Sequence, residues 1–188
     1  MPREAPIIRD ATEADVGAIT RIYGYEVENG IATFEEVAPS ETEMAARRSK
    51  IVGLGLPYLV AEDVTGLVMG YAYAGPFHTR AAYRFTVEDT IYIDRGARRR
   101  GVGRALLGTL IARSETAGCR QMMALITQVD DSASVALHEK MGFRPIGIAH
   151  AVGYKFNHWT DVVYMQRAIG AGDTARPDRA APGQPVAA

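Results

Sequence analysis

The sequence contains a single cysteine, Cys119, among 188 residues. One thiol cannot form a disulfide within the chain, which is typical of a protein in a reducing cytoplasm. No stretch approaches the roughly 20 consecutive apolar residues that a membrane-spanning helix requires. The first ten residues include Arg3, Glu4, Arg9 and Asp10 instead of the apolar block of a secretory signal. We therefore expect a cytoplasmic protein with no membrane partner.

Neither sign of charge is in surplus, because 21 lysines and arginines stand against 22 aspartates and glutamates, for a net charge of −1. Without excess cations to displace the counterions of a polyanion, no nucleic-acid partner is expected. Hydrophobic residues make up 47% of the chain, which is enough for the core of one domain. We predict a single domain over residues 1–169. Residues 170–188 are rich in Ala, Pro and Gly and contain no leucine, isoleucine or aromatic residue, so this tail is expected to be disordered.

The pattern of apolar, helix-starting and turn residues predicts runs of strands with helices interspersed. Thr12 and Ser40 are typical first residues of helices, and Asn29-Gly30 and Thr65-Gly66 are typical of breaks and turns. The predicted strands are 7–8, 58–62, 67–74, 85–93, 122–127, 143–153 and 161–167, and the predicted helices 12–29, 40–52, 102–111 and 132–141. This order, β-α-α-β-β-β-α-β-α-β-β, indicates an α/β layered domain with a mixed sheet flanked by helices.

The predicted strand 85–93 has an apolar and a polar face. Alternation places on the apolar face Phe85, Val87, Ile91 and Ile93, and on the polar face Thr86, Glu88, Thr90 and Tyr92. Asp89 falls on the apolar face and interrupts its pattern.

The strongest local signal is Arg98-Arg99-Arg100-Gly101-Val102-Gly103-Arg104, between a strand and an apolar helix. The first amides of a helix are unpaired donors at the positive end of its dipole, and glycines let a ligand approach the backbone. With the flanking arginines they can form a site for phosphate groups. The segment is not a P-loop, since no Gly-Lys-Ser/Thr follows, nor a dinucleotide fingerprint, since Leu106 replaces the third small residue. A helix-opening turn with solvated arginines is the alternative.

This segment, followed by Ser134-Val-Ala-Leu-His138-Glu-Lys-Met-Gly142-Phe143, resembles the acetyl-CoA signature of the GNAT N-acetyltransferases. Residues 73–77, 82–93 and 153–162 further resemble the phosphinothricin and methionine sulfoximine acetyltransferases of that superfamily. The resemblance implies the GNAT acyl-CoA N-acyltransferase fold, acetyl-CoA as co-substrate, and acetyl transfer to the α-amine of a small amino-acid-like compound. It also implies a homodimer, with the C-terminal strands and the early helices near the interface.

Two residues are expected to carry the chemistry of such an enzyme. An α-ammonium is mostly protonated at pH 7, so a base must remove a proton before its nitrogen can attack a thioester. Glu88, on the polar face of the central strand, is the candidate base, and an exposed strand carboxylate is the alternative. His138 stands where many GNAT enzymes have a tyrosine acid, and it either protonates the departing thiolate or orients a neighbour.

The resemblance also implies which residues contact acetyl-CoA. They are Ile91, Tyr92, Ile93, Arg98, Arg99, Arg100, Gly101, Val102, Gly103, Arg104, Asp131 and Lys140. The subfamily usually has asparagine at the position of Asp131. An aspartate keeps the acceptor but loses the amide donor, and it has the alternative role of capping the helix that begins near Ser132.

The acceptor is expected to contact residues from three parts of the chain: Phe34, Tyr73, His78, Thr79, Arg80, Tyr83, Glu88, Asp89 and Thr90. Arg80 matters most among them, because a guanidinium can bind an amino acid's carboxylate with two hydrogen bonds. A solvated loop arginine beside core aromatics is the alternative.

Two other functions stay open at this point. The first is acetylation of protein N-termini or lysines, and the second is a CoA-binding module without catalysis, which would have no use for a base. No metal is expected, because the remaining histidines, His78, His150 and His158, lack metal-ligand spacing.

Overall fold

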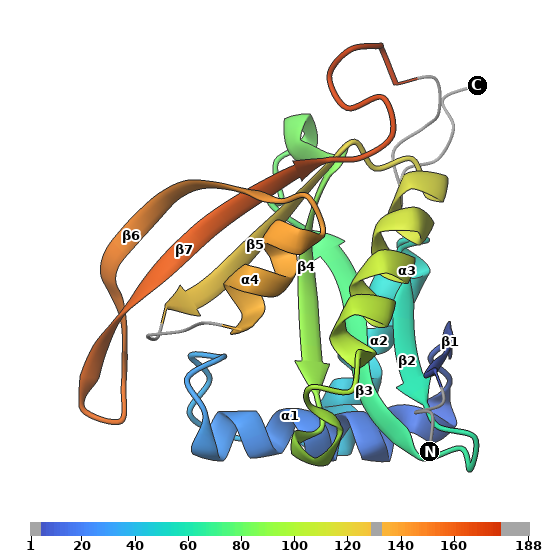
Figure 1. The fold of residues 1–188 in the computed structure, drawn as a ribbon, viewed down its shortest axis with the longest axis vertical. Helices are drawn as coiled ribbons and strands as arrows, with labels where there is room; N and C mark the ends of the chain where they lie inside the picture. The colour runs from blue at the N-terminus through green and yellow to red at the C-terminus, as the bar shows by residue number, and fades with distance from the viewer. Residues whose placement is uncertain (1–4, 129–132, 178–188) are drawn as a thin grey trace.

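The computed structural model describes residues 5–128 and 133–177. Their order of elements is the one that the sequence predicts (Figure 1). The strands are β1 (Ile7–Asp10), β2 (Tyr58–Glu62), β3 (Val68–Pro76), β4 (Thr86–Ile93), β5 (Gln121–Gln128), β6 (Arg144–Lys155) and β7 (His158–Ala168). The helices are α1 (Val16–Asn29), α2 (Glu41–Gly53), α3 (Val102–Thr116) and α4 (Ala133–Lys140), with 3-10 turns η1 (Glu13–Asp15), η2 (Ala81–Tyr83) and η3 (Arg95–Ala97).

The described strands form one sheet in the order β1-β2-β3-β4-β5-β7-β6. Neighbouring strands are antiparallel except β4 and β5, which are parallel and therefore need the crossover through α3. Pairing between β4 and β5 covers only Thr86 to Glu88 opposite Gln121 to Met123. Beyond Glu88 the two strands separate, as Figure 1 shows. The mixed sheet predicted from the sequence is thus confirmed, and it opens in the middle.

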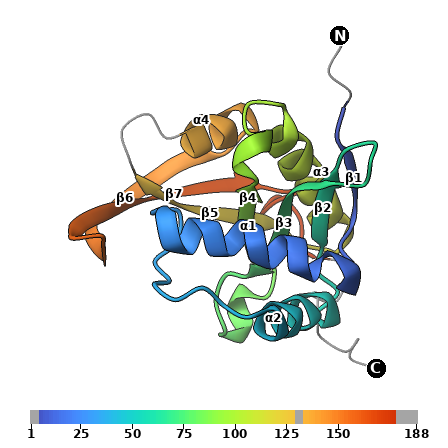
Figure 2. The ribbon, with the colours of Figure 1, turned by 90° about the horizontal axis from the view of Figure 1, so that it is seen from below.

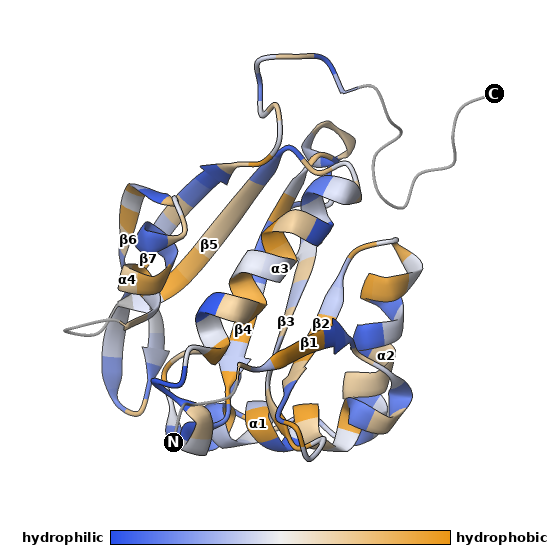
Figure 3. Cartoon of the chain, turned by 45° about the vertical axis from the view of Figure 1, so that its right-hand side comes forward, coloured by the Kyte–Doolittle hydropathy of each residue, from blue (hydrophilic) through white to orange (hydrophobic). Residues whose placement is uncertain are grey.

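Helices cover both faces of the sheet: α3 and α4 lie on one side and α1 and α2 on the other (Figure 2). On the first side, Leu106, Leu107 and Leu110 of α3 are fully buried in one apolar cluster with strand residues such as Met122. On the second side, α1 supplies a separate cluster with residues at helical spacing. Along α2 and α3, hydrophobic residues alternate with hydrophilic ones, as expected for helices that bury one face (Figure 3). Burying these two faces is the main favourable contribution to folding.

The β6–β7 hairpin is longer than the sequence predicts. The strands were expected at 143–153 and 161–167, whereas they reach Lys155 and begin again at His158. Phe156 and Asn157 form the turn between them, with φ of 50° and 61°. Two successive positive φ values match the twist of a hairpin but are usually found at Asn-Gly or Asp-Gly, so Phe-Asn gave no turn signal.

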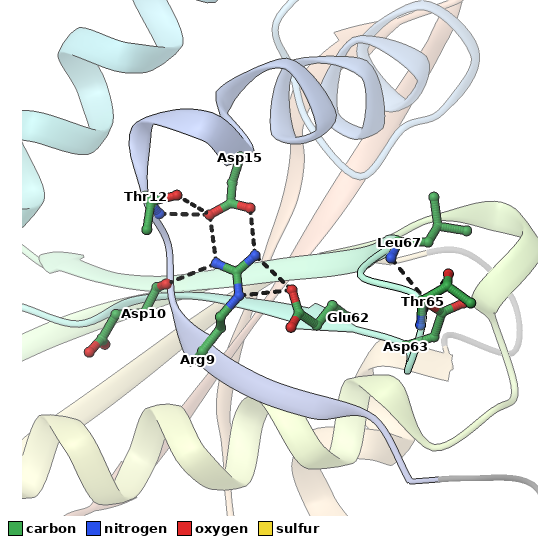
Figure 4. A network of polar contacts seen from close by, with 8 residues as sticks. All are labelled: Arg9, Asp10, Thr12, Asp15, Glu62, Asp63, Thr65 and Leu67. Carbon is green, nitrogen blue, oxygen red and sulfur yellow. Dashed lines mark hydrogen bonds and ion pairs between the residues drawn. The ribbon is translucent and has the colours of Figure 1, made fainter.

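A partly buried polar network joins β1, η1 and β2 (Figure 4). The Arg9 guanidinium donates to both carboxylate oxygens of Asp15, at 2.7 and 2.8 Å, and to Glu62 at 2.8 Å. Asp15 also accepts from the backbone N–H of Thr12 at 2.7 Å. The helix start predicted at Thr12 is therefore a 3-10 turn held by Asp15, and α1 proper begins at Val16.

The chain leaves β7 through a series of turns over residues 170–177. Residues 178–188 lie outside the described part, so the disorder expected for the tail stays a prediction. Among the described helices, none is long and apolar enough to cross a membrane.

Candidate active site

A cavity of about 730 Å³ occupies the place where β4 and β5 separate. Its lining comes from both faces of the sheet, because it includes Glu26 of α1 and residues 31–34 after α1, as well as Ser134 and His138 of α4. Between them it is bordered by residues 88–92 of β4 and 124–127 of β5. The opening in the sheet therefore connects its two sides at the level of Glu88.

Glu88 is half-buried at the edge of this cavity. Burial raises the pKa of its carboxyl above the usual value, and the neighbouring Asp89 charge raises it further. A raised pKa is closer to neutral pH, which makes a carboxylate a better proton acceptor for catalysis. Glu88 is not the exposed strand carboxylate of the alternative interpretation.

Asp89 and His138 form a buried pair on the α4 side of the sheet. Their side chains are 2% and 1% exposed, and His138 Nε2 lies 3.0 Å from Asp89 Oδ2. Its Nδ1 lies 2.7 Å from the Ser134 carbonyl oxygen, which can only accept, so Nδ1 carries a proton. Burial lowers the pKa of His138, but the hydrogen bond and charge of Asp89 outweigh this, and the net shift is upward.

The pair restricts what His138 can do, because both ring nitrogens already have partners. The ring packs edge-on against Phe143 at 4.9 Å between centroids, which fixes its plane. Within the described residues, Asp89 Oδ1 is buried without a hydrogen-bond partner. Asp89 itself is one of the residues that line the cavity.

The predicted phosphate segment opens α3, as expected. Gly101 has φ of 83°, a conformation that glycine adopts without strain, and a Cβ there would meet nothing within 4 Å. Gly103 differs, because a Cβ would come within 3.1 Å of Leu137, so this glycine lets α3 approach α4. The side chains of Arg99, Arg100 and Arg104 are exposed, while Arg98 pairs with the buried Glu26 of α1.

The residues predicted to contact acetyl-CoA are brought together only in part. Ile91, Tyr92 and Arg98 line the cavity, and Ile93 and the start of α3 follow it along the chain. Lys140 is the exposed last residue of α4. Asp131 lies outside the described residues, so its expected contact stays a prediction.

The residues predicted to contact the acceptor are divided between two cavities. Phe34, Glu88, Asp89 and Thr90 line the first. A second cavity, of about 530 Å³, is lined by the remaining five, Tyr73, His78, Thr79, Arg80 and Tyr83. The two cavities are neighbours, because Tyr73 on β3 pairs directly with Thr90 on β4.

The second cavity has an aromatic floor and a cationic lining. The ring of Tyr58 stacks on Tyr73 at 4.8 Å between centroids and on Tyr71 at 6.0 Å. Among the described residues, its lining includes four cationic side chains, namely Arg47, Lys50, Arg80 and Arg84, and no carboxylate. Arg47 is already paired with Glu35, at 2.7 and 3.1 Å. The cavity therefore suits an anionic group attached to an apolar body.

Two partners in the site were not predicted from the sequence. Glu26 is 8% exposed and pairs with Arg98. Its helical spacing from Ile19, Ile22 and Tyr23 was an available signal that it shares the buried face of α1. The pairing of Asp89 with His138 had no such signal, because it joins a strand and a helix 49 residues apart.

These residues fit the acetyl-CoA that the resemblance implies. The gap between β4 and β5 gives a linear chain a passage through the sheet, and Asp89 Oδ1 offers a free acceptor for an N–H group. The first amides of α3 and the exposed Arg100 and Arg104 suit phosphates. No group of three or more His, Cys, Asp or Glu side chains that could hold a metal ion occurs in residues 5–128 and 133–177.

Comparison with known proteins agrees with this geometry. A family model described as an acetyltransferase (GNAT) domain matches residues 8–164. The chain is 48% identical to the phosphinothricin N-acetyltransferase of Alcaligenes faecalis over 178 residues, covering 95% of this chain and 90% of that one. It is 36% identical to the L-methionine sulfoximine/L-methionine sulfone acetyltransferase of Pseudomonas aeruginosa over 159 residues, covering 85% and 92%.

A solved structure with a similar fold contains the co-substrate. The phosphinothricin acetyltransferase of Sinorhizobium meliloti, in complex with AcCoA, has a TM-score of 0.91 and 47% sequence identity. The match covers 95% of this chain and 96% of that one.

Proposed function

The chain belongs to the GNAT acetyltransferase family, and on that premise we propose that it transfers the acetyl group of acetyl-CoA to the α-amine of a small amino-acid-like compound. Phosphinothricin and methionine sulfoximine or sulfone are the leading acceptors, since these compounds name its relatives. The observation that carries the proposal is the half-buried Glu88, with its raised pKa, in a cavity that crosses the sheet.

Glu88 is the proposed general base. Acetyl-CoA supplies a thioester whose carbonyl carbon accepts the amine nitrogen, so that a C–N bond forms and the C–S bond breaks. Glu88 takes one proton from the acceptor's ammonium and passes it to solvent. Of the other two ammonium protons, one stays on the amide and one ends on the thiol of CoA. Transfer is direct, so the buried Cys119 has no part in it.

His138 is the proposed orienting residue, and this choice follows from its two hydrogen bonds. Its imidazole holds Asp89 in place from α4, and donating a proton to a thiolate would require it to give up that carboxylate. Asp89, in turn, has its second oxygen, Oδ1, buried without a hydrogen-bond partner among the described residues.

Arg80 is the proposed partner of the acceptor's α-carboxylate. The second cavity's excess of cations supports this role, as does its contact with the reaction cavity through Tyr73 and Thr90. An acceptor anchored there would direct its amine toward Glu88. Acetylation of a peptide is not the favoured function, because the relatives described above are named for amino-acid analogues.

A free-thiol assay with acetyl-CoA tests the proposal. The acceptor panel consists of phosphinothricin, methionine sulfoximine, methionine sulfone, ordinary amino acids and a short peptide. Thiol release with the first three compounds and none with the peptide is the expected result. Release with the peptide alone, or with no amine despite acetyl-CoA binding, would overturn the proposal.

We further propose that the protein is a cytoplasmic homodimer. The outward side of the β6–β7 hairpin exposes six large apolar side chains, each 47–68% exposed, namely Ile146, Ile148, Val152, Tyr154, Phe156 and Trp159. Large exposed apolar side chains gathered on one hairpin are typical of a surface that another protein covers. The reduced, buried state of Cys119 supports the cytoplasmic location.

A further inference from the structure

The segment after α1 forms one wall of the reaction cavity, through Ala32, Thr33 and Phe34. Two tyrosines hold it from the sheet and from α1. The Tyr92 hydroxyl of β4 donates to the Ala32 carbonyl oxygen at 3.1 Å, and Tyr23 Oη lies 2.9 Å from Thr33 Oγ1. Within the described residues, no backbone–backbone hydrogen bond holds residues 32–34, so their position depends on such side-chain contacts.

The β6–β7 hairpin holds the same wall from the opposite side. Lys155 Nζ donates to the Thr33 carbonyl oxygen at 2.9 Å. The ring of Phe34 packs directly on Gly153, and a Cβ at that glycine would lie 2.0 Å from Phe34 Cζ. Real Cβ atoms do not approach so closely, so any larger residue at 153 must displace the ring.

Both contacts come from the inward side of the hairpin. Gly153 and Lys155 are buried, while their neighbours Val152, Tyr154 and Phe156 are exposed. Lys155 is only 3% exposed, and burying an ammonium is costly unless it is paired. Burial lowers the pKa of Lys155, and its carbonyl partner and the nearby charges of Glu36, Glu26 and Glu35 offset that cost in part. The arrangement thus commits a buried charge to one short segment of the cavity wall.

We propose that Gly153 and Lys155 are positioning residues for acceptor binding, which hold Thr33 and Phe34 in place as the wall of the cavity that contains Glu88. The expected change in the acceptor's KM rests on the proposed function. The expected loss of order in the cavity wall rests only on the contacts described above. Neither residue touches the reacting atoms. Their effect is expected in the acceptor's KM, since the phosphate segment at the start of α3 lies elsewhere.

The first test replaces Gly153 with alanine and compares it with Gly147→Ala on the same strand, where a Cβ would meet nothing within 4 Å. Gly153→Ala should raise the acceptor's KM about tenfold, because small displacements in a binding site are costly, and leave the acetyl-CoA Kd unchanged. Gly147→Ala should match the wild type in both. Equal acceptor KM values for the two variants would overturn the proposal.

The second test removes the ammonium. Lys155→Met keeps the aliphatic stem and should raise the acceptor's KM about tenfold through the lost charged hydrogen bond. Arg144→Met, an exposed position on the same strand, is the control and should leave it unchanged. A fall in kcat and in acetyl-CoA affinity with no change in the acceptor's KM would contradict a positioning role.

A double variant tests whether Gly153→Ala acts through its packing contact with Phe34 or through a general loss of folding. If Gly153 acts through the ring, adding Gly153→Ala to Phe34→Leu should change the acceptor's KM far less than in the wild type. Additive effects would contradict the inference.

Amide hydrogen exchange of residues 31–38 gives a readout that needs no activity. Exchange should be faster in Gly153→Ala than in Gly147→Ala, by about tenfold for amides protected through this contact. Equal exchange would overturn the inference even if acetyl transfer is observed. Absence of transfer in the wild type would count against the proposed function alone.

Discussion

At the scale of single residues, the pair of Asp89 and His138 sets the chemistry of the α4 side of the cavity. Asp89 interrupts the apolar face of β4, and a lone carboxylate there would be strongly disfavoured. His138 compensates it from a helix that packs over the strand, at 3.0 Å. The structure therefore supports an orienting role for the histidine, and this role makes a prediction about stability that an acid role does not.

His138→Leu should lower the free energy of unfolding by about 3 kcal/mol, because it leaves Asp89 buried without a partner. The double variant Asp89→Asn/His138→Leu should recover part of that loss, since the uncompensated charge is gone. Urea denaturation of the wild type, the two single variants and the double variant measures the coupling. A His138→Leu variant with unchanged stability and strongly reduced kcat would instead identify the histidine as the acid.

Single residues also mark the limit of what the sequence predicts. Alternation correctly placed Glu88 on the polar face and Asp89 on the apolar one, because a strand has a strict period of two. The partners of Asp89 and Lys155 could not be predicted, since each bond joins elements that are distant in sequence, and its geometry depends on how those elements pack. The sequence showed that Asp89 would be buried at a cost, but it did not show that His138 would offset that cost.

At the scale of elements, the start of α3 combines free helix amides with exposed arginines. The predicted anion site requires both, and Arg98 is less available because it pairs with Glu26. The contribution of the arginines can be separated from that of the amides, since only the side chains change on substitution.

The double variant Arg100→Gln/Arg104→Gln should raise the acetyl-CoA Kd about tenfold, through loss of charge-assisted contacts to phosphate. Its kcat at saturating acetyl-CoA should stay near that of the wild type. Arg113→Gln, in the last turn of the same helix, is the matched control. Calorimetric titration with acetyl-CoA measures the difference, and an unchanged Kd would favour the helix-opening turn with solvated arginines.

The junction of β1, η1 and β2 depends on the Arg9–Asp15 pair (Figure 4). The hydrogen bonds from Arg9 are the main reason that the pKa of Asp15 falls from 3.8 to about 2, against an opposing effect of burial. Because the folded-state pKa lies below the unfolded one, the stabilisation is present above about pH 4 and is lost as the pH falls toward 2.

Asp15→Asn should therefore lower the free energy of unfolding by about 2 kcal/mol at pH 7, and the gap to the wild type should narrow as the pH falls from 4 to 2. Asp10→Asn, an exposed neighbour 3.9 Å from Arg113, should change stability little. Denaturation curves across this pH range provide the comparison. A gap that stays constant with pH would show that the carboxylate's charge is not the cause.

The order and type of the elements followed from apolar periodicity and from turn residues, because each element buries one face. The ends of the β6–β7 hairpin did not, since its turn uses Phe156 and Asn157 where glycine is usual. The extra residues on β6 include Lys155, so the error in the strand end concealed a contact to the cavity wall.

At the scale of the whole molecule, the sheet is divided where β4 leaves β5, and the reaction cavity lies in that division. The β6–β7 hairpin has two roles: its inward side contacts the cavity wall, and its outward side exposes apolar side chains. We propose that a second copy of the chain packs against the outward side in a homodimer.

Analytical ultracentrifugation tests whether two chains associate through the outward side of the hairpin. The wild type should sediment at twice the 20.4 kDa mass of one chain. Trp159→Glu, which places a charge on the most exposed side chain of the patch, should shift the protein toward the monomer, because a desolvated, unpaired charge disfavours association. Val37→Glu changes an exposed valine outside the hairpin and should have no effect. A monomeric wild type would contradict the dimer.

The proposed role of Glu88 as general base can be tested through the pH dependence of acetyl transfer by Glu88→Gln and by the wild type. The wild-type kcat/KM for the acceptor should fall as the pH drops through the pKa of Glu88, which lies above the ordinary 4.5. Glu88→Gln should lower kcat about 100-fold and abolish that limb, while leaving the acetyl-CoA Kd unchanged. Glu28→Gln, an exposed change on α1, should behave as the wild type. Full turnover by Glu88→Gln, with the acidic limb intact, would show that Glu88 is not the base.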